Sequence, residues 1–149
     1  MKSINFVQAS EEDLSELLRL ETACFSYPWR KNHFLESFRH SDMVFLVTCE
    51  NCNIGYSVFR FILDECEILS LGIEPECQSR GYGTQLIEFC MQKARENNCK
   101  KLFLEVRVSN LPAQRLYEKI GFKSIGLRKN YYQGSEGRED AIVMGVDCN

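Results

Sequence analysis

The sequence lacks long hydrophobic runs and an excess of basic residues. No stretch approaches the roughly 20 apolar residues of a membrane-spanning helix, and the opening segment MKSINFVQASEEDL has no long apolar core of a secretory signal. Lysines and arginines number 18 against 21 acidic residues, which gives a net charge of −3. A dedicated nucleic-acid binder normally carries a basic excess. We therefore expect a cytoplasmic protein that neither enters a membrane nor binds nucleic acid directly.

A metal-binding pattern is also missing. Eight cysteines are scattered along the chain, and the Cys49-x-x-Cys52 pair has no second pair at the right spacing. The two histidines, His33 and His40, do not follow a zinc-finger pattern. Zinc held through Cys49 and Cys52 stays an alternative, but we expect no metal and reduced cysteines that act as small hydrophobic residues.

Internal repeats, low-complexity tracts and linkers are absent as well. A chain of 149 residues is long enough to bury a core, and its composition marks no boundary. The sequence therefore predicts one domain over residues 1–149.

What is present is centred on residues 66–84, CEILSLGIEPECQSRGYGT. Residues 67–73 form an apolar run of strand length, and Pro75 ends it because proline cannot donate to a sheet ladder. A Q-x-x-G-x-G loop follows at residues 78–83, and apolar residues then recur at helical spacing. Such a unit is a natural anion site, because glycines allow close approach and the first N–H groups of a helix have no intrahelical partner.

The loop by itself admits other interpretations. Many strand–helix turns need glycine only for a positive φ. The Walker pattern requires Gly-Lys-Ser/Thr, and the dinucleotide fingerprint requires a third glycine and an acid on the next strand; neither occurs here. Phosphate binding by this loop is therefore a hypothesis that needs support from the rest of the chain.

Apolar periodicity predicts further elements on both sides of this unit. Helices are expected from the cap residue Ser10 to about residue 24, over residues 31–40, and from Asn110 to a stop at Gly121. Strands are expected at residues 4–8, 43–49, 54–63, 101–108, 122–127 and 141–146, with a polar loop at 130–140. This order predicts an α/β (α+β) fold, a mixed and mostly antiparallel sheet with helices on both faces.

The later segments carry candidate chemistry. Glu105 interrupts an apolar strand, and a carboxylate beside apolar walls can act as a general base. A solvated carboxylate on a half-buried strand explains the same pattern. Tyr117 lies on the apolar stripe of the next helix, so it is either a core aromatic or a proton donor to a departing thiolate. Glu67 on the central strand is a rival base, and Asn110 can serve simply as a helix cap.

The central loop, with its strand and helix, resembles the acetyl-coenzyme A loop of the GCN5-related N-acetyltransferases, the GNAT superfamily. The order of elements is similar over nearly the whole chain. The segments LFLEVRVSN, AxxLYEKIGF, RKNYY, GREDAIVM and YPW resemble one branch, the bacterial ribosomal-protein alanine N-acetyltransferases of the RimI type. This resemblance implies the GNAT fold and acetyl transfer from acetyl-coenzyme A to the N-terminal alanine of a small-subunit ribosomal protein.

The resemblance also assigns roles to residues. The proton acceptor of the family falls on Glu105 and the proton donor on Tyr117. The positions implied to contact acetyl-coenzyme A are Leu71, Gly72, Ile73, Ser79, Arg80, Gly81, Tyr82, Gly83, Thr84 and Asn110. Those implied at the acceptor groove are Trp29, Tyr131 and Tyr132, and Glu67 is placed with them as well as being the rival base.

Two residues depart from the family pattern. Gly72 stands where alanine is usual, which is expected to loosen the strand, and Tyr82 stands where a small or aliphatic residue is more common. Two other functions stay open: acetylation of a lysine side chain or small amine, and a non-catalytic module that binds acyl-coenzyme A. The presence of both Glu105 and Tyr117 argues against the module, because a pure binder needs neither.

Overall fold

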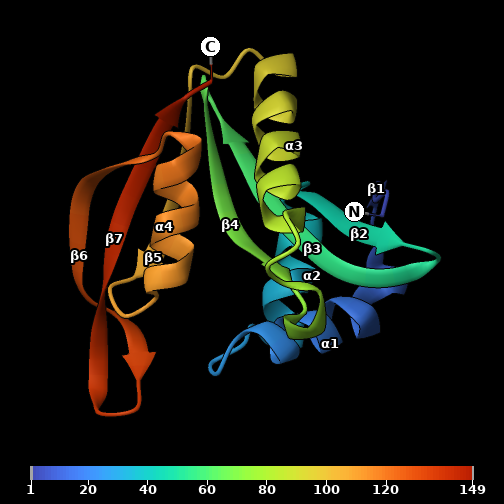
Figure 1. Ribbon diagram of the computed structural model, residues 1–149, viewed down its shortest axis with the longest axis horizontal. Coiled ribbons are helices and arrows are strands. Elements are labelled where there is room, and N and C mark those ends of the chain that lie inside the picture. The colour runs from blue at the N-terminus through green and yellow to red at the C-terminus, as the bar shows by residue number, and fades with distance from the viewer. Residues whose placement is uncertain (1, 149) are drawn as a thin grey trace. The chain divides into compact units, whose positions relative to one another are not determined.

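The computed structural model describes residues 2–148, and in this range seven strands form one sheet in the order β1-β2-β3-β4-β5-β7-β6 (Figure 1). The strands are β1 Asn5–Gln8, β2 Met43–Cys49, β3 Cys52–Ile62, β4 Glu65–Ile73, β5 Lys101–Arg107, β6 Lys123–Gly134 and β7 Gly137–Asp147. The helices are α1 Leu14–Cys24, α2 Lys31–Arg39, α3 Tyr82–Glu96 and α4 Leu111–Ile120, with short 3-10 turns at Glu11–Asp13 and Pro75–Cys77.

The sheet is mixed and mostly antiparallel, so the predicted fold class is confirmed. Antiparallel pairs join β1 to β2, β2 to β3, β5 to β7, and β6 to β7. The parallel pair joins β4 to β5, with Glu67 opposite Phe103. A parallel pair needs a crossover, and the segment between β4 and β5 contains α3.

The chain packs as two compact units. The first unit comprises residues up to Arg60 together with Leu69–Glu88, and the second comprises Phe61–Ile68 with the residues from Phe89 onward. The prediction that residues 1–149 act as one domain stays a prediction.

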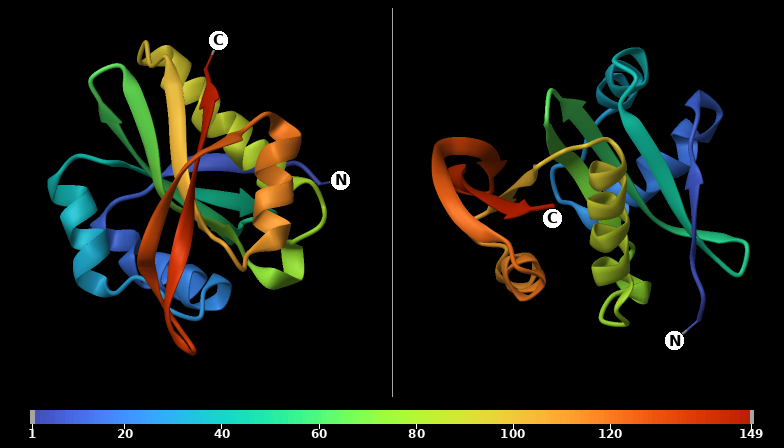
Figure 2. Two further views of the ribbon diagram at one scale, coloured as in Figure 1. Left: turned by 90° about the vertical axis from the view of Figure 1, so that its left-hand side faces the viewer. Right: turned by 90° about the horizontal axis from the view of Figure 1, so that it is seen from above.

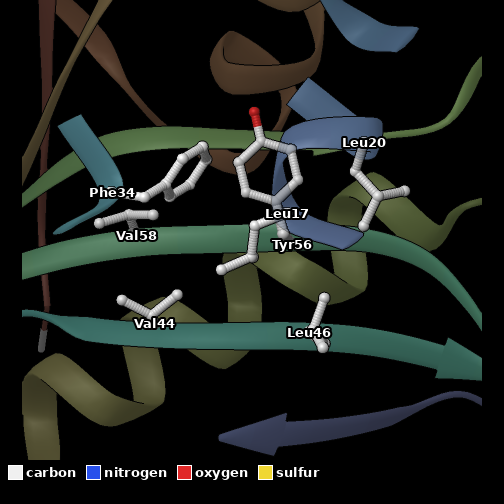
Figure 3. Packing of buried hydrophobic residues seen from close by; sticks show 7 residues of the cluster. All are labelled: Leu17, Leu20, Phe34, Val44, Leu46, Tyr56 and Val58. Carbon is white, nitrogen blue, oxygen red and sulfur yellow. The ribbon is translucent and has the colours of Figure 1, made fainter. Parts of the chain in front are cut away.

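The core of the first unit lies between α1, α2 and the strands β2 and β3. Figure 3 shows the Tyr56 ring among aliphatic side chains, with its hydroxyl oxygen directed away from the strand that carries Val44 and Leu46. The buried cluster consists of Leu17, Leu20, Phe34, Val44, Leu46, Tyr56 and Val58. The predicted cap at Ser10 is confirmed, since its hydroxyl accepts from the Glu12 N–H at 3.3 Å and its own N–H donates to Asp13 at 2.9 Å.

The second unit is built on the alternation of β5. Leu102, Leu104 and Val106 are buried, whereas the residues between them are partly exposed on the opposite face. The helix α4 stops at Gly121, whose φ of 124° is a conformation that glycine adopts readily. Its N–H donates to the last carbonyls of α4, so the predicted stop is confirmed.

The predicted loop at residues 130–140 is wrong. The strands β6 and β7 run through it as one long hairpin, drawn in orange and red in Figure 2, with Tyr132 opposite Glu139 and Gln133 opposite Arg138. Most of β6 is exposed, so its strand pairing rests on backbone hydrogen bonds and leaves no apolar alternation to read. The first hairpin turn is also shorter than the predicted residues 50–53: Glu50 and Asn51 alone form it, with φ of 51° and 66°.

The eight cysteines are free thiols, five of them buried. Within residues 2–148, no helix is long and apolar enough to cross a membrane. Over the same residues, no three histidine, cysteine or acidic side chains gather in a way that could hold a metal ion.

Candidate active site

In the first unit, the end of β4 leads into the glycine loop. The strand ends at Ile73, whose carbonyl accepts a hydrogen bond from the Gln78 side chain at 2.8 Å, which holds the loop against the strand. Ser79 and Gly81 have φ of 63° and 84°, and α3 begins directly after them at Tyr82. The first turn of α3 contains no acidic residue. Its N–H groups therefore form an electropositive helix start without a local carboxylate to compete for an anion.

The Tyr82 side chain points into the first unit. It is 3% exposed, and its hydroxyl lies 4.0 Å from the Cys49 Sγ on β2. The large side chain at this loop position is therefore buried in the core of the first unit.

Packing in the first unit explains why glycine stands at position 72, which the sequence alone does not show. A Cβ atom there would lie 2.8 Å from the Sγ of Cys24 and 3.4 Å from the Tyr56 ring. The Cys24 thiol in turn donates to the Ile73 carbonyl at 3.4 Å. The end of α1 thus lies directly on β4, and glycine at position 72 makes room for it.

In the second unit, Glu105 lines an open cavity of about 290 Å³. Its side chain is 14% exposed, so the carboxylate is reachable from solvent. Glu67, the rival base, lines the same cavity. The full lining consists of Ile62, Glu65, Glu67, Phe103, Leu104, Glu105, Ile125, Arg128 and Val143. The structure therefore brings both candidate bases to one apolar-walled site.

Arg128 and Tyr131 of β6 both interact with Glu105. The Arg128 Nε lies 3.1 Å from the Glu105 Oε1, and the Arg128 guanidinium lies 5.5 Å from the centre of the Tyr131 ring. Burial, and then a hydrogen bond that the Tyr131 hydroxyl donates to Glu105, raise the pKa of Tyr131 to about 12. Tyr131 thus stays protonated at neutral pH and is a donor to the carboxylate.

Tyr132 interacts electrostatically with the predicted base. Burial raises its pKa, and the negative charge of Glu105 adds to this effect. The Arg107 guanidinium lies 4.4 Å from the centre of the Tyr132 ring and pairs with Glu139 at 3.0 Å. These contacts hold Tyr132 on the β6–β7 hairpin close to the candidate site.

Tyr117 lies on α4 and is 9% exposed, with its ring centre 5.7 Å from that of Phe122. Burial raises its pKa, so the phenol keeps its proton at neutral pH. It does not line the cavity of Glu105. Asn110 caps the same helix, because its side-chain oxygen accepts from the Ala113 N–H at 3.2 Å.

Trp29 lies in the first unit, between α1 and α2. Its ring packs edge-on against Phe34 at 5.1 Å between ring centres, and its backbone N–H donates to the Glu21 carboxyl. The sequence analysis did not identify Glu21 as a buried residue, because in the sequence it looks like any other polar residue of an amphipathic helix. It also missed Arg128, although the RKNYY segment contains it.

Comparisons with known proteins identify the family of the chain. The sequence pattern of the acetyltransferase (GNAT) family matches residues 14–122. The chain belongs to the GNAT acetyltransferase family. A GNAT enzyme is an acetyl-coenzyme A-dependent N-acetyltransferase, and the glycine loop fits that cosubstrate, because its positive-φ residues precede a helix start free of acidic side chains.

Individual relatives of this GNAT protein cover most of its length. The ribosomal protein bS18-alanine N-acetyltransferase of Haemophilus influenzae is 35% identical over 137 residues, which is 89% of this chain and 90% of the relative. The enzyme of the same name from Escherichia coli K12 is 31% identical over 134 residues, 90% of each chain.

Solved structures show the same fold. The crystal structure of the ribosomal-protein-S18-alanine N-acetyltransferase from Escherichia coli matches with a TM-score of 0.92 at 28% identity, over 99% of this chain and 95% of that one. Ard1 from Thermoplasma volcanium matches with a TM-score of 0.85 at 24% identity, over 97% of both chains, and shares the fold.

Proposed function

We propose that this protein acetylates the N-terminal alanine of ribosomal protein bS18 by direct transfer from acetyl-coenzyme A. The observation that carries the proposal is Glu105, a reachable carboxylate paired with Arg128 in an apolar-walled cavity. The names of relatives that are 31% and 35% identical over about nine-tenths of the chain support the choice of acceptor.

Glu105 is the general base of the proposed reaction. An N-terminal amine has a pKa near 8, so roughly a tenth is neutral at pH 7, whereas lysine has a pKa near 10.4. A carboxylate acting directly or through one water removes the remaining proton. Arg128 and Tyr131 hold the carboxylate in place, because the guanidinium pairs with it at 3.1 Å and the Tyr131 hydroxyl donates a hydrogen bond to it.

Tyr117 is the proposed general acid. Transfer of the acetyl group to the amine breaks the thioester bond, and the departing thiolate requires a proton. We assign this proton to the Tyr117 hydroxyl, which is protonated at neutral pH and regains a proton from water after the transfer. No cysteine nucleophile is needed, since holding both substrates in place suffices for direct transfer.

Acetyl-coenzyme A brings an activated acetyl group as a thioester. We assign its pyrophosphate to the loop and helix start formed by Ser79, Arg80, Gly81, Tyr82, Gly83 and Thr84. Backbone groups of Leu71, Gly72 and Ile73 are proposed to hold the acyl arm and polarise the acetyl carbonyl. Asn110 keeps its cap role and is also assigned to the cosubstrate. Trp29, Glu67, Tyr131 and Tyr132 are assigned to the acceptor.

The test is acetyl transfer to two peptides, followed by mass spectrometry. One peptide begins with a free alanine, and the other has a blocked N-terminus and one internal lysine. We expect acetylation of the first peptide alone. Transfer to the lysine alone would contradict the proposed acceptor. Binding of acetyl-coenzyme A without transfer to either peptide would instead support a non-catalytic module.

A further inference from the structure

Glu21 is a buried carboxyl group for which the proposed chemistry has no use. It lies on α1 and is 2% exposed. Its Oε1 accepts from the Tyr56 hydroxyl at 2.7 Å and from the Ser70 hydroxyl at 2.8 Å, and these two hydroxyls lie 2.9 Å from each other. The Trp29 backbone N–H donates to the same carboxyl group. One side chain therefore links α1 to β3, to β4 and to the segment before α2.

These contacts satisfy the carboxyl group without making it a source of stability. Removing a carboxyl from water is costly, and a well-packed apolar side chain of similar size often stabilises a protein as much or more. A buried polar network of this kind mainly defines the geometry of the groups that it joins. The question is thus which groups Glu21 holds in place.

The linked groups belong to the two substrate sides of the proposed reaction. Ser70 directly precedes Leu71–Ile73, the part of β4 assigned to acetyl-coenzyme A. Trp29, the last residue of the segment 25–29, is assigned to the acceptor. The Trp29 ring packs on Phe34, and Phe34 packs on Tyr56 at 6.2 Å between ring centres, so both the ring and the backbone of Trp29 are held by groups connected to Tyr56.

A second contact between α1 and β4 leads to the same conclusion. The Cys24 thiol donates to the Ile73 carbonyl and occupies the space that a side chain at position 72 would need. Glu21 and Cys24 lie three residues apart and so share a face of α1. The end of α1 is therefore attached to β4 at Ser70 and again at Ile73.

We propose that Glu21 is a positioning residue that sets the acceptor-binding segment 25–29 against Ser70–Ile73 of β4 and thereby determines the affinity for the acceptor. The proposal rests on the proposed function for its substrate assignment. Its structural half, that Glu21 holds Trp29, can be measured without any turnover.

Trp29 is the only tryptophan of the chain, so its fluorescence reports on this segment alone. The variants are Glu21→Leu, which removes the hydrogen bonds at similar volume, and Glu21→Gln, which retains an amide oxygen as acceptor. Glu36→Gln is the matched control, since Glu36 is an exposed carboxylate on α2 of the same unit. Ser70→Ala is a milder variant that removes one hydroxyl, should Glu21→Leu fail to fold.

We expect acrylamide to quench Trp29 at least twofold more efficiently in Glu21→Leu, with a smaller change in Glu21→Gln and none in Glu36→Gln. The KM for the alanine peptide is expected to rise at least tenfold in Glu21→Leu, while the Kd for acetyl-coenzyme A changes less than twofold. Recovery of most of the peptide KM in Glu21→Gln would distinguish positioning from general loss of structure.

Unchanged quenching in a folded variant would overturn the proposal. So would a peptide KM that stays within twofold of wild type, or a KM and a Kd that rise together. If wild type transfers to neither peptide, the proposed function fails, and the quenching comparison alone then decides whether Glu21 holds Trp29.

Discussion

Two glutamates, one in each compact unit, have the same side chain and opposite surroundings. Glu21 in the first unit is 2% exposed and is bonded by two hydroxyls and a backbone N–H. Glu105 in the second unit lines a cavity of about 290 Å³ and pairs with the exposed guanidinium of Arg128.

The two carboxyl groups differ in whether a substrate or a water molecule can reach them. A sealed carboxyl group can hold neighbouring segments but cannot reach a substrate proton. A carboxylate at a cavity wall can meet an amine or a water, and a neighbouring cation fixes its orientation. The same residue type thus serves positioning in one unit and, as we propose, proton transfer in the other.

The largest expected effect comes from removing the open carboxylate. Glu105→Gln should lower kcat by about 10²–10⁴-fold, the usual contribution of a general base, with little change in acetyl-coenzyme A affinity. Steady-state kinetics with the alanine peptide measures it. Glu67→Gln is the comparison, because the rival base Glu67 lines the same cavity. A larger loss in Glu67→Gln than in Glu105→Gln would move the base to β4.

The proposed acid is tested by Tyr117→Phe. We expect kcat to fall by about 10²-fold, because a general acid contributes at least this much and phenylalanine fills the same space. Thermal unfolding should change little, since the ring packing against Phe122 is retained. Tyr131→Phe, which removes a phenol from β6, serves as the comparison. Equal losses in the two variants would argue against a specific donor.

The tight packing of the first unit is tested by Gly72→Ala. The new Cβ would lie 2.8 Å from the Cys24 Sγ, so we expect a loss of about 1–3 kcal/mol in the free energy of unfolding. Urea denaturation measures it. In a Cys24→Ala background the same substitution should cost less, because the nearest atom is gone. Identical costs in both backgrounds would show that Cys24 is not the obstacle.

The smallest expected effect is the dependence of stability on pH through Glu21. Burial raises the pKa of Glu21, so the folded state holds the proton more tightly than the unfolded chain. Its contribution to stability is full below the unfolded pKa, about 4.3, and is lost as pH rises through the folded pKa. Wild type should therefore lose stability relative to Glu21→Gln between acidic and neutral pH, as measured by urea denaturation at several pH values. Wild type gaining stability relative to Glu21→Gln as pH rises would contradict a raised pKa.

Much of the fold was predictable because it depends on local patterns. The strand β2 has the predicted bounds, Pro75 lies just past the end of β4, and Ser10 and Gly121 cap their helices as expected. The β6–β7 hairpin was not predictable in full. Its outer half is exposed on both faces, and such a ribbon has no hydrophobic period to detect.

The candidate site also contains a part that the sequence predicts and a part that it does not. The positions of Glu105, Tyr117 and the glycine loop follow from motifs that are continuous in the sequence. Arg128 beside Glu105, Ser70 and Tyr56 around Glu21, and Cys24 over Gly72 join residues that lie 23 to 49 positions apart. No local pattern encodes such pairs.

By itself, the sequence determined the order of strands and helices, the glycine loop before α3, the resemblance to N-acetyltransferases and the residues with suitable chemistry. Only the tertiary structure decided which carboxyl group is sealed and which is open. Local propensity acts over a few residues, whereas burial and pairing depend on side chains that folding brings together from distant segments.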